Sequence, residues 1–369
     1  MNTATHAKHI GLTIAMCFGV AVLEGFDIQA LGVTAPKLAP EFKLAPEQIG
    51  LLGSMSNIGL VIGAGFGGWL ADRVGRKPVF IAAVLAFGLF TLGTSLAQGL
   101  NSLFAWRFLA GLGFGAALPN MMAVAAEIST PSQRSMIAAS MFCGMPFGGG
   151  TAALMTQLLP ANSDWRTIFI MGGVLPLLLA ILMFAFMTET LQPGRHQEQR
   201  SGHIELALFG EGRALPSLLL WLTFLPTLLI LYLILNWLPL LVKANGLDSH
   251  VAPQASLAFN FASVAGALFF GRVVDKLGVR WPLAFAYGGL IAALIALGAA
   301  HELTSVLVLS GTVGAFLMGA NYSLYGVAAS YYPAHFRGTG SGASVAFGRV
   351  GSIIGPLLAG FMLGGGATA

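Results

Sequence analysis

The sequence has little charge, few cysteines and no recognisable catalytic motif. Only 9% of its 369 residues are Asp, Glu, Lys or Arg, 56% are hydrophobic, and the mean hydropathy is +0.81. This composition excludes a soluble domain and indicates a chain that crosses a lipid bilayer repeatedly. The two cysteines, Cys17 and Cys143, lie in apolar runs without CxxC or metal-type spacing. A disulfide framework or zinc site is therefore not expected, and we interpret both as packing residues.

Motifs of enzyme chemistry are also missing. The sequence contains no HExxH, GxSxG, P-loop or metal-spaced His/Cys cluster. We therefore expect no enzyme activity, no catalytic residue, no cofactor and no metal. The net charge of +4 does not call for nucleic acid as a partner, because the basic excess follows the loops on one side of the membrane.

Long apolar runs dominate the chain instead. A hydrocarbon core of about 30 Å needs about 20 apolar residues in a helix. Windows of that length predict eleven membrane helices, over residues 10–36, 47–70, 79–99, 101–125, 135–159, 165–188, 214–242, 252–272, 281–300, 303–329 and 338–363. The first run is too long for a signal-peptide core, so we expect it to be retained. The longest polar segment predicts three parts: an N-terminal half (1–188), a cytoplasmic linker (189–213) and a C-terminal half (214–369).

The distribution of Lys and Arg predicts the orientation. Twelve of the 18 basic residues lie on the side of the N-terminus and the linker, four lie on the other side, and Arg107 and Arg349 lie inside predicted spans. Cytoplasmic loops carry the excess of basic residues, so we expect a multi-pass protein of the inner (plasma) membrane with a cytoplasmic N-terminus.

One loop sequence occurs twice. GGWLADRVGRKP (67–78), after the second span, is partly repeated by GRVVDKLGVRWP (271–282), after the eighth. The residues that match at one constant offset are Gly68 with Gly271, Asp72 with Asp275, Gly75 with Gly278, Pro36 with Pro239, and Arg134 with Arg337. A duplicated six-helix unit explains this, with two parallel halves about an axis along the membrane normal. Chance agreement is the alternative, because membrane helices are rich in Gly and Pro.

These motifs resemble those of a known family. GGWLADRVGRKP resembles the loop 2–3 signature of the major facilitator superfamily, and WRFLAGLGFGAALPN (106–120) resembles its helix-four signature. LEGFDIQA (23–30) is similar to the helix-one acidic motif of its aromatic acid/proton symporters, with Glu24 where the usual acid is Asp. LEGFDIQALG, MFCGMPFGGG, LILNWLPLLV and FGRVGSIIGPLLAG are together most similar to the 3-(3-hydroxyphenyl)propionate transporters.

The resemblance implies an all-α polytopic membrane protein with the major facilitator fold. That fold has two pseudo-symmetric six-helix halves, and here we expect the twelfth helix to be absent, with the carboxyl end on the periplasmic side. It also implies a monomeric, proton-coupled secondary transporter that imports an aromatic carboxylate such as 3-(3-hydroxyphenyl)propionate by alternating access. A symporter for hydroxybenzoate or protocatechuate remains open. So does an efflux antiporter, to which GMPFGGG has a partial likeness.

Glu24, Asp27 and Arg107 are the predicted proton-coupling residues. Glu24 and Asp27 are three residues apart and so share one helix face. An ionised side chain at the membrane centre costs roughly 2.5 to 3.5 kcal/mol, so two acids in one span indicate a functional site. Low dielectric favours the neutral carboxyl form, and a group that alternates between both forms can carry a proton. Arg107 needs an anionic partner, and the resemblance implies Asp27, although a static salt bridge that fixes helix packing is the alternative.

Arg349 is the predicted anchor for the substrate carboxylate. It lies about a dozen residues from the nearer end of the last span, with Ser344 and Ser352 at helical spacing. A guanidinium at membrane depth suits bidentate capture of a carboxylate, and snorkelling to the interface is the alternative. Other polar residues at depth could bond a phenolic hydroxyl, although interhelical hydrogen bonds alone would explain them. These candidates are Asn236, Asn260, Asn321, Tyr322 and Tyr325.

The repeated loop predicts an inner gate. An Asp at a helix end can accept hydrogen bonds from a facing helix N-terminus, and the basic cluster can pair with an acid such as Glu127. The alternative is a basic topology anchor. The predicted gating residues are Gly68, Asp72, Arg73, Gly75, Arg76, Lys77, Glu127, Arg134, Asp275 and Arg337.

A channel is the competing class of membrane protein. Channels line a pore with rings of charged side chains or carbonyl groups. Here the ionisable residues at depth are scattered over the first, fourth and eleventh spans. That scatter favours a closed binding site. It therefore favours a transporter whose two halves rock about a site at the membrane midplane.

Overall fold

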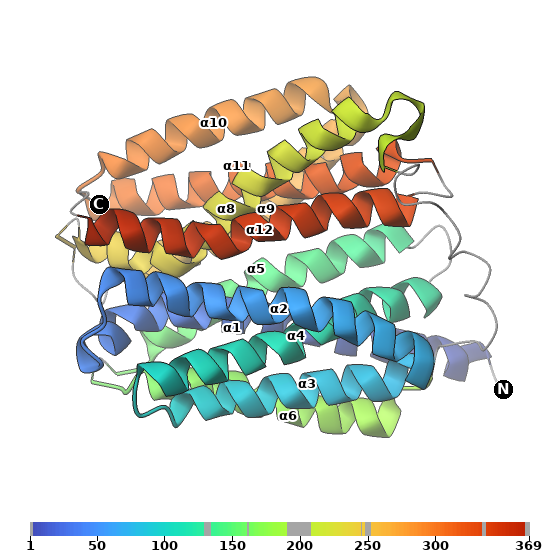
Figure 1. Cartoon of the computed structure of the whole chain (residues 1–369), viewed down its shortest axis with the longest axis horizontal. Helices are drawn as coiled ribbons and strands as arrows, with labels where there is room; N and C mark the ends of the chain where they lie inside the picture. The colour runs from blue at the N-terminus through green and yellow to red at the C-terminus, as the bar shows by residue number, and fades with distance from the viewer. Residues whose placement is uncertain are drawn as a thin grey trace. The chain divides into compact units, whose positions relative to one another are not determined.

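The computed structural model describes residues 3–128, 134–160, 162–189, 208–244, 246–247, 252–333 and 337–365. Every regular element in these residues is helical (Figure 1). The helices are α1 (Thr3–Glu41), α2 (Pro46–Val74), α3 (Arg76–Ser95), α4 (Leu100–Ile128), α5 (Arg134–Leu158), α6 (Arg166–Phe186), the 3-10 turn η1 (Gly210–Gly212), α8 (Ala214–Ala244), α9 (Ala252–Leu277), α10 (Arg280–Gly298), α11 (Leu303–Tyr331) and α12 (Arg337–Gly364).

The predicted all-α membrane fold is confirmed. Each predicted span corresponds to one helix of the described chain, and ten of these helices are long and apolar enough to cross a membrane. The clearest boundary difference is at α1, which was expected to end at residue 36 and continues to Glu41. Pro36 and Pro40 lie inside this helix. Membrane helices tolerate internal proline because neighbouring groups satisfy the freed backbone carbonyls.

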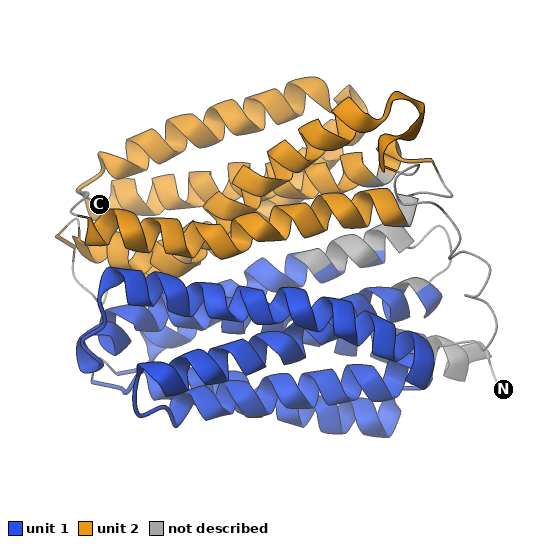
Figure 2. Ribbon diagram, viewed as in Figure 1, with its two compact units in different colours: residues 1–191 blue, residues 192–369 orange. Residues whose placement is uncertain are grey.

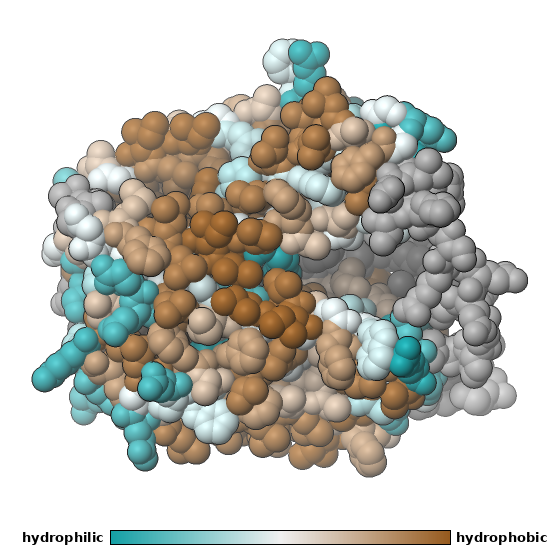
Figure 3. Space-filling view, in the orientation of Figure 1, coloured by the Kyte–Doolittle hydropathy of each residue, from teal (hydrophilic) through white to brown (hydrophobic). Residues whose placement is uncertain are grey.

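Large apolar side chains cover the outer surface. Phe184, Trp281 and Ile295 are 73%, 72% and 71% exposed. Figure 3 shows hydrophobic residues over most of the viewed face and hydrophilic residues gathered toward the ends of the helices. Such exposure would be unfavourable in water, where contiguous apolar patches are small, so this surface fits lipid as the solvent.

The chain divides into two compact units, unit 1 (residues 1–191) and unit 2 (residues 192–369) (Figure 2). In unit 1, α2 packs on α4, α1 packs on α5, and α3 contacts both α4 and α6. In unit 2, α9 packs on α11, α8 packs on α12, and α10 contacts α11. The first five helices of each unit therefore pack on one another in the same pairs: the first with the fifth, the second with the fourth, and the third with the fourth.

The two units also repeat a close helix crossing at the offset found in the sequence. A Cβ atom added to Gly63 of α2 would overlap the carbonyl oxygen of Leu112 in α4. In unit 2, a Cβ atom added to Gly266 of α9 would overlap the carbonyl oxygen of Ala315 in α11. Small residues allow such backbone contact between membrane helices.

A second crossing is repeated in the same way. A Cβ atom on Gly148 of α5 would overlap the carbonyl oxygen of Val22 in α1, and one on Gly351 of α12 would overlap that of Leu225 in α8. Agreement of backbone contacts at one sequence offset is not expected from chance likeness of loop residues. The two halves are therefore duplicated in structure as well as in sequence.

Candidate functional site

Asp27 and Arg107 form a buried, bidentate ion pair in unit 1. Arg107 Nη1 donates to Asp27 Oδ1 and Nη2 donates to Oδ2, each at 2.8 Å. Both residues are only 2% exposed. Asp27 lies on α1 and Arg107 on α4, so the pair joins two helices that are far apart in the sequence. Two parallel charge-assisted hydrogen bonds are the strongest geometry available to a carboxylate and a guanidinium.

Three further helices contribute to this pair. Thr91 of α3 donates its hydroxyl to Asp27 Oδ1 at 3.0 Å, and Arg107 Nε donates to the Ser56 hydroxyl of α2 at 3.0 Å. The guanidinium carbon lies 5.6 Å from the centre of the Phe169 ring on α6. Sequence analysis did not identify Thr91 or Ser56, because single hydroxyl residues are frequent in membrane helices and carry no signal of their own.

Glu24 lies one turn before Asp27 on α1 and is 1% exposed. Arg107 bonds Asp27 and Ser56, and Glu24 lies beside this pair on the same helix. The adjacent Gly25 touches the backbone of Met145 in α5, which places this turn of α1 at the α1/α5 crossing. The structure thus separates the predicted coupling residues into the Asp27–Arg107 pair and a buried neighbouring acid.

Arg349 of α12 is half-buried in unit 2 and contacts Tyr232 of α8. Its Nη1 donates to the Tyr232 hydroxyl at 2.7 Å, and its guanidinium carbon lies 5.9 Å from the centre of the tyrosine ring. This contact is a hydrogen bond to a hydroxyl group. The predicted flanking serines bond their own helix: Ser344 donates to Gly340 O at 3.0 Å and Ser352 to Arg349 O at 2.7 Å.

The other predicted substrate-binding residues also lie in unit 2. Asn236 donates its amide to Tyr232 O and Asn260 to Ser256 O, both at 2.8 Å and four residues back along the same helix. Tyr322 and Tyr325 are half-buried, and the Tyr325 ring lies edge-on to Phe224 at 5.3 Å. Asn321 differs from these four residues. It is 3% exposed, and its Oδ1 accepts no hydrogen bond within the described residues.

The loop after α2 is held by acidic side chains. Arg76 Nη2 lies 2.9 Å from Asp72 Oδ1, and Arg76 Nε lies 3.5 Å from Glu127 Oε1. The carboxylate of Glu189, directly after α6, accepts the backbone N–H groups of Arg76 and Lys77 at 3.0 and 3.1 Å. These N–H groups open α3, where an anion is stabilised by the unpaired donors and the helix dipole. Sequence analysis placed Glu189 only in the linker.

Arg73 contacts an aromatic ring, and Lys77 contacts a backbone carbonyl group of α6. The guanidinium carbon of Arg73 lies 4.0 Å from the centre of the Trp69 ring, and Lys77 Nζ donates to Phe184 O at 3.2 Å. Gly68 has no atom within 4 Å of the position a Cβ would occupy. Cationic side chains are therefore fixed at this end of unit 1 by aromatic and carbonyl groups as well as by acids.

The matching loop of unit 2 repeats the turn, and Val279 lies at the position that matches Arg76. Gly75 and Gly278 both adopt a positive φ, of 118° and 75°, which favours glycine at the two matching turns. Asp275 lies in the last turn of α9, as Asp72 does in α2. The side chains of Arg134 and Arg337, predicted as gating residues, lie outside the described part of the chain.

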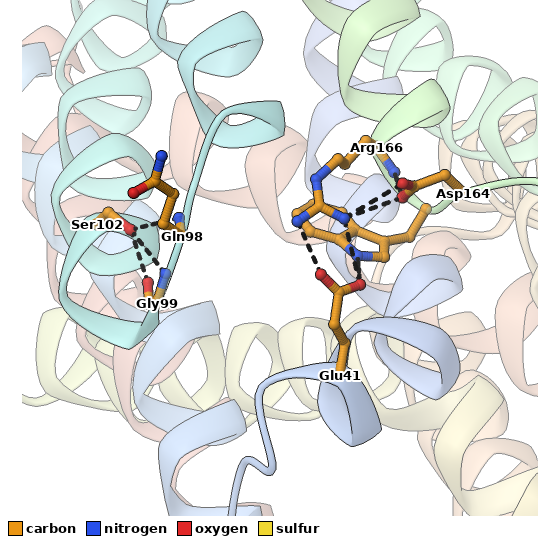
Figure 4. A network of polar contacts seen from close by, with 7 residues as sticks. Glu41, Gln98, Gly99, Ser102, Asp164 and Arg166 are labelled. Carbon is orange, nitrogen blue, oxygen red and sulfur yellow. Dashed lines mark hydrogen bonds and ion pairs between the residues drawn. The ribbon is translucent and has the colours of Figure 1, made fainter.

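A polar network joins α1 to α6 at the opposite end of unit 1 (Figure 4). Glu41 accepts hydrogen bonds from Trp165 Nε1 at 2.6 Å and Arg166 Nη2 at 2.7 Å, and Arg166 also pairs with Asp164 at 3.2 Å. Sequence analysis did not predict this network, which joins the end of α1 to the start of α6, away from the loop after α2. Figure 4 also shows Ser102 bonded to the turn that opens α4.

The sequence is similar to those of known transporters. The model of the family described as Major Facilitator Superfamily matches residues 17–356. The 3-(3-hydroxy-phenyl)propionate transporter of Escherichia coli (strain K12) is 39% identical over 366 residues, which are 98% of this chain and 90% of that relative. The 4-hydroxybenzoate transporter PcaK and the gallate transporter of Pseudomonas putida are 32% and 31% identical, over 99% and 97% of this chain and 88% and 86% of theirs.

Solved structures with the same fold include two transporters. A bacterial homolog of the human lysosomal transporter Spinster superposes with a TM-score of 0.81 at 18% identity and covers 96% of this chain and 82% of its own. The D-xylose-proton symporter superposes with a TM-score of 0.79 at 18% identity. The match covers 95% of this chain and 89% of the symporter chain. At this identity the likeness shows the fold alone.

Proposed function

This chain belongs to the major facilitator superfamily, and we propose that it imports an aromatic carboxylate together with protons by alternating access. The observation that carries the proposal is the Asp27–Arg107 pair, a titratable acid held at membrane depth by a partner that cannot lose its own proton. The substrate class follows from the relatives, which are named as transporters of hydroxyphenylpropionate, hydroxybenzoate and gallate.

The ion pair supplies a coupling step. While the pair is closed, Asp27 is ionised and its two oxygens accept three hydrogen bonds. If a rearrangement of α1 or α4 separates the pair, the carboxylate loses its counter-charge in a low-dielectric site and takes up a proton. Return of Arg107 favours release of that proton. Glu24, one turn away, is proposed as a second proton site on the same helix.

The substrate contacts are proposed to lie in unit 2. Arg349 binds the carboxylate, because it carries the one basic side chain at membrane depth in the sequence of that unit, and no Asp or Glu follows Glu302. The phenolic hydroxyl donates to Asn321 Oδ1, since a buried acceptor with no donor among the described residues calls for one. Asn236, Asn260, Tyr322 and Tyr325 surround the ring or support the helices.

The loop after α2 is proposed to act as the inner gate. Its residues form contacts that can break together: the Asp72–Arg76 pair, the Arg76–Glu127 pair and the Glu189 carboxylate on α3. We further propose a monomer in the inner membrane. The distribution of Lys and Arg favours a cytoplasmic N-terminus.

Uptake by proteoliposomes tests the proposal. Purified protein is reconstituted, an alkaline interior is imposed, and accumulation of labelled 3-(3-hydroxyphenyl)propionate is followed. We expect saturable accumulation that a protonophore abolishes. One proton per monoanion is electroneutral, whereas a second proton adds about 2.3 kcal/mol per 100 mV, so an imposed potential separates the two ratios.

Competing functions give different results in the same assay. Unlabelled 4-hydroxybenzoate, protocatechuate, gallate and cinnamate serve as competitors, and the strongest competitor identifies the preferred acid. Accumulation that requires an acidic interior would instead establish proton-coupled efflux. Flux without saturation would establish a channel.

A further inference from the structure

We propose that Thr91 is a positioning residue for proton coupling, whose hydroxyl holds Asp27 in both of its protonation states. It donates to the ionised carboxylate and accepts a hydrogen bond from the neutral acid. The inference rests on the proposed function, in which Asp27 carries the proton. Thr91 lies on α3 and is not a member of the Asp27–Arg107 ion pair.

Seven other threonines in the described helices donate their hydroxyl to the backbone of their own helix. In six of them the hydroxyl donates to the carbonyl oxygen four residues earlier, at 2.6 to 3.2 Å; they are Thr34, Thr94, Thr156, Thr223, Thr227 and Thr312. This is the usual local bond of a threonine in a helix. Thr91 instead donates to Asp27 Oδ1 at 3.0 Å, on another helix, and is 0% exposed.

Protonation of Asp27 creates a demand that Arg107 cannot meet. A neutral carboxyl group has an O–H donor, and a guanidinium has five donors and no acceptor. In a buried site the new donor needs an acceptor, because an unmade hydrogen bond away from water is unfavourable. Among the described contacts of Asp27, the Thr91 hydroxyl alone has lone pairs to offer.

A rotation about one side-chain bond is sufficient for the change of role. The Thr91 hydroxyl proton turns to the carbonyl oxygen of Phe87, four residues earlier, as in the six other threonines. Its oxygen then accepts the proton of neutral Asp27. No proton leaves Thr91: the proton on Asp27 is the transported one, and Thr91 changes only its donor and acceptor directions.

The methyl group of Thr91 has a separate contact. A Cβ atom built at Gly172 of α6 would lie 3.4 Å from Thr91 Cγ2, so the methyl group packs at the α3/α6 contact. Hydroxyl and methyl functions can therefore be separated by two substitutions. Thr91→Val keeps the branched shape and removes the hydroxyl, whereas Thr91→Ser keeps the hydroxyl and removes the methyl group.

The two variants are compared in reconstituted full-length protein. For Thr91→Val we expect proton-driven accumulation to fall at least about tenfold, as for loss of one hydrogen bond to a charged group, and the pH dependence of labelled-for-unlabelled exchange to flatten. For Thr91→Ser we expect both properties to stay within about twofold of the wild type. The opposite pattern, with Thr91→Ser impaired and Thr91→Val normal, would establish a packing role and overturn the inference.

Thr94→Val is the matched control. Thr94 lies on the same helix and is also 0% exposed, and its hydroxyl donates to Phe90 O within that helix. We expect its accumulation to match the wild type, and an equal loss in Thr94→Val and Thr91→Val would overturn the inference. Asp27→Asn is measured in parallel. If Asp27→Asn accumulates substrate, the proposed function itself is wrong; if Asp27→Asn fails while Thr91→Val accumulates normally, only the role of Thr91 is wrong.

Discussion

The two units share a scaffold but differ in what they bury. Their helices cross at matching glycines, yet the polar cluster of unit 1 is replaced by largely apolar residues in unit 2. The residues of the cluster and their counterparts at the same offset are Asp27 and Ile230, Thr91 and Leu294, Ser56 and Phe259, and Arg107 and Ser310. The duplicated fold thus carries an acid and its basic partner at two positions of unit 1 whose counterparts in unit 2 are uncharged.

The surroundings of the polar cluster in unit 1 differ from those of its counterparts in unit 2. In unit 2 an apolar cavity of about 210 Å³ lies between α8, α10 and α11, and Leu294 is among its lining residues. In unit 1 the matching region is filled, because Ala30 and Leu31 of α1 pack with Trp165, Ile168 and Phe169 at the start of α6. An apolar cavity offers no partner for a carboxylate, and the charged contact that we propose for the substrate in unit 2 is Arg349.

The largest effect is expected when the acid is removed from unit 1. Asp27→Asn makes this position neutral, as Ile230 is in unit 2. It should abolish accumulation of substrate against a gradient, because the carboxyl group that pairs with Arg107 can then no longer take up and release a proton. Exchange of labelled for unlabelled substrate should continue. Uptake driven by a pH gradient alone checks this, and wild-type accumulation in the mutant would show that Asp27 is not the proton carrier.

The next largest effect is expected from Arg349 in unit 2. Arg349→Ala should weaken binding of the acid by roughly 2 to 5 kcal/mol, because a desolvated carboxylate would lose its counter-charge. Arg349→Lys should also weaken binding, since it keeps the charge and loses the planar fork. Calorimetry on purified protein measures both affinities.

The amide analogue of the substrate is the control for this prediction. It should bind the wild type less tightly than the acid and lose little more in either mutant. Equal affinity of acid and amide for the wild type would place the carboxylate anchor elsewhere, and Arg107 would be tested first.

A smaller and symmetric effect is expected at the shared crossings. Gly63→Ala in unit 1 and Gly266→Ala in unit 2 should each lower the free energy of unfolding by about 1 to 3 kcal/mol, the usual range for overpacking. Gly65→Ala is the control, because no atom lies within 4 Å of its Cβ position. Thermal unfolding in detergent measures all three. A loss in only one of the two units would argue against equivalent crossings.

The smallest effect is expected at the repeated loop. Asp72→Asn should lower the maximal transport rate about two- to fivefold with little change in substrate affinity, since loss of a helix-end charge contact is worth roughly 0.3 to 1 kcal/mol. Asp275→Asn should have almost no effect, because Val279 occupies the position that Arg76 has in unit 1. Equal rates for Asp72→Asn and the wild type would argue against a gate in this loop and would leave its basic residues with a role in membrane orientation alone.

Sequence analysis predicted the helices, their duplication and the charged candidates. These properties are local: in lipid, a run of apolar residues must satisfy its backbone within one helix, so each span can be recognised without its neighbours. Charges inside such runs stand out for the same reason, which is why Asp27, Arg107 and Arg349 were identified. The predicted end of the first helix was wrong because internal proline is tolerated there.

The partners of those charges depended on the tertiary structure. Thr91, Ser56, Tyr232 and Glu189 are ordinary residues in the sequence, and nothing in their spacing distinguishes them from other hydroxyl or acidic side chains. They acquire their roles from the contacts between helices, which glycine at the crossings permits at backbone distance. The sequence by itself determined which helices cross the membrane and where charge is buried, because both follow from the free energy of transfer into lipid. Only the tertiary structure decided which side chains face that charge, because hydrogen bonds join residues from different helices.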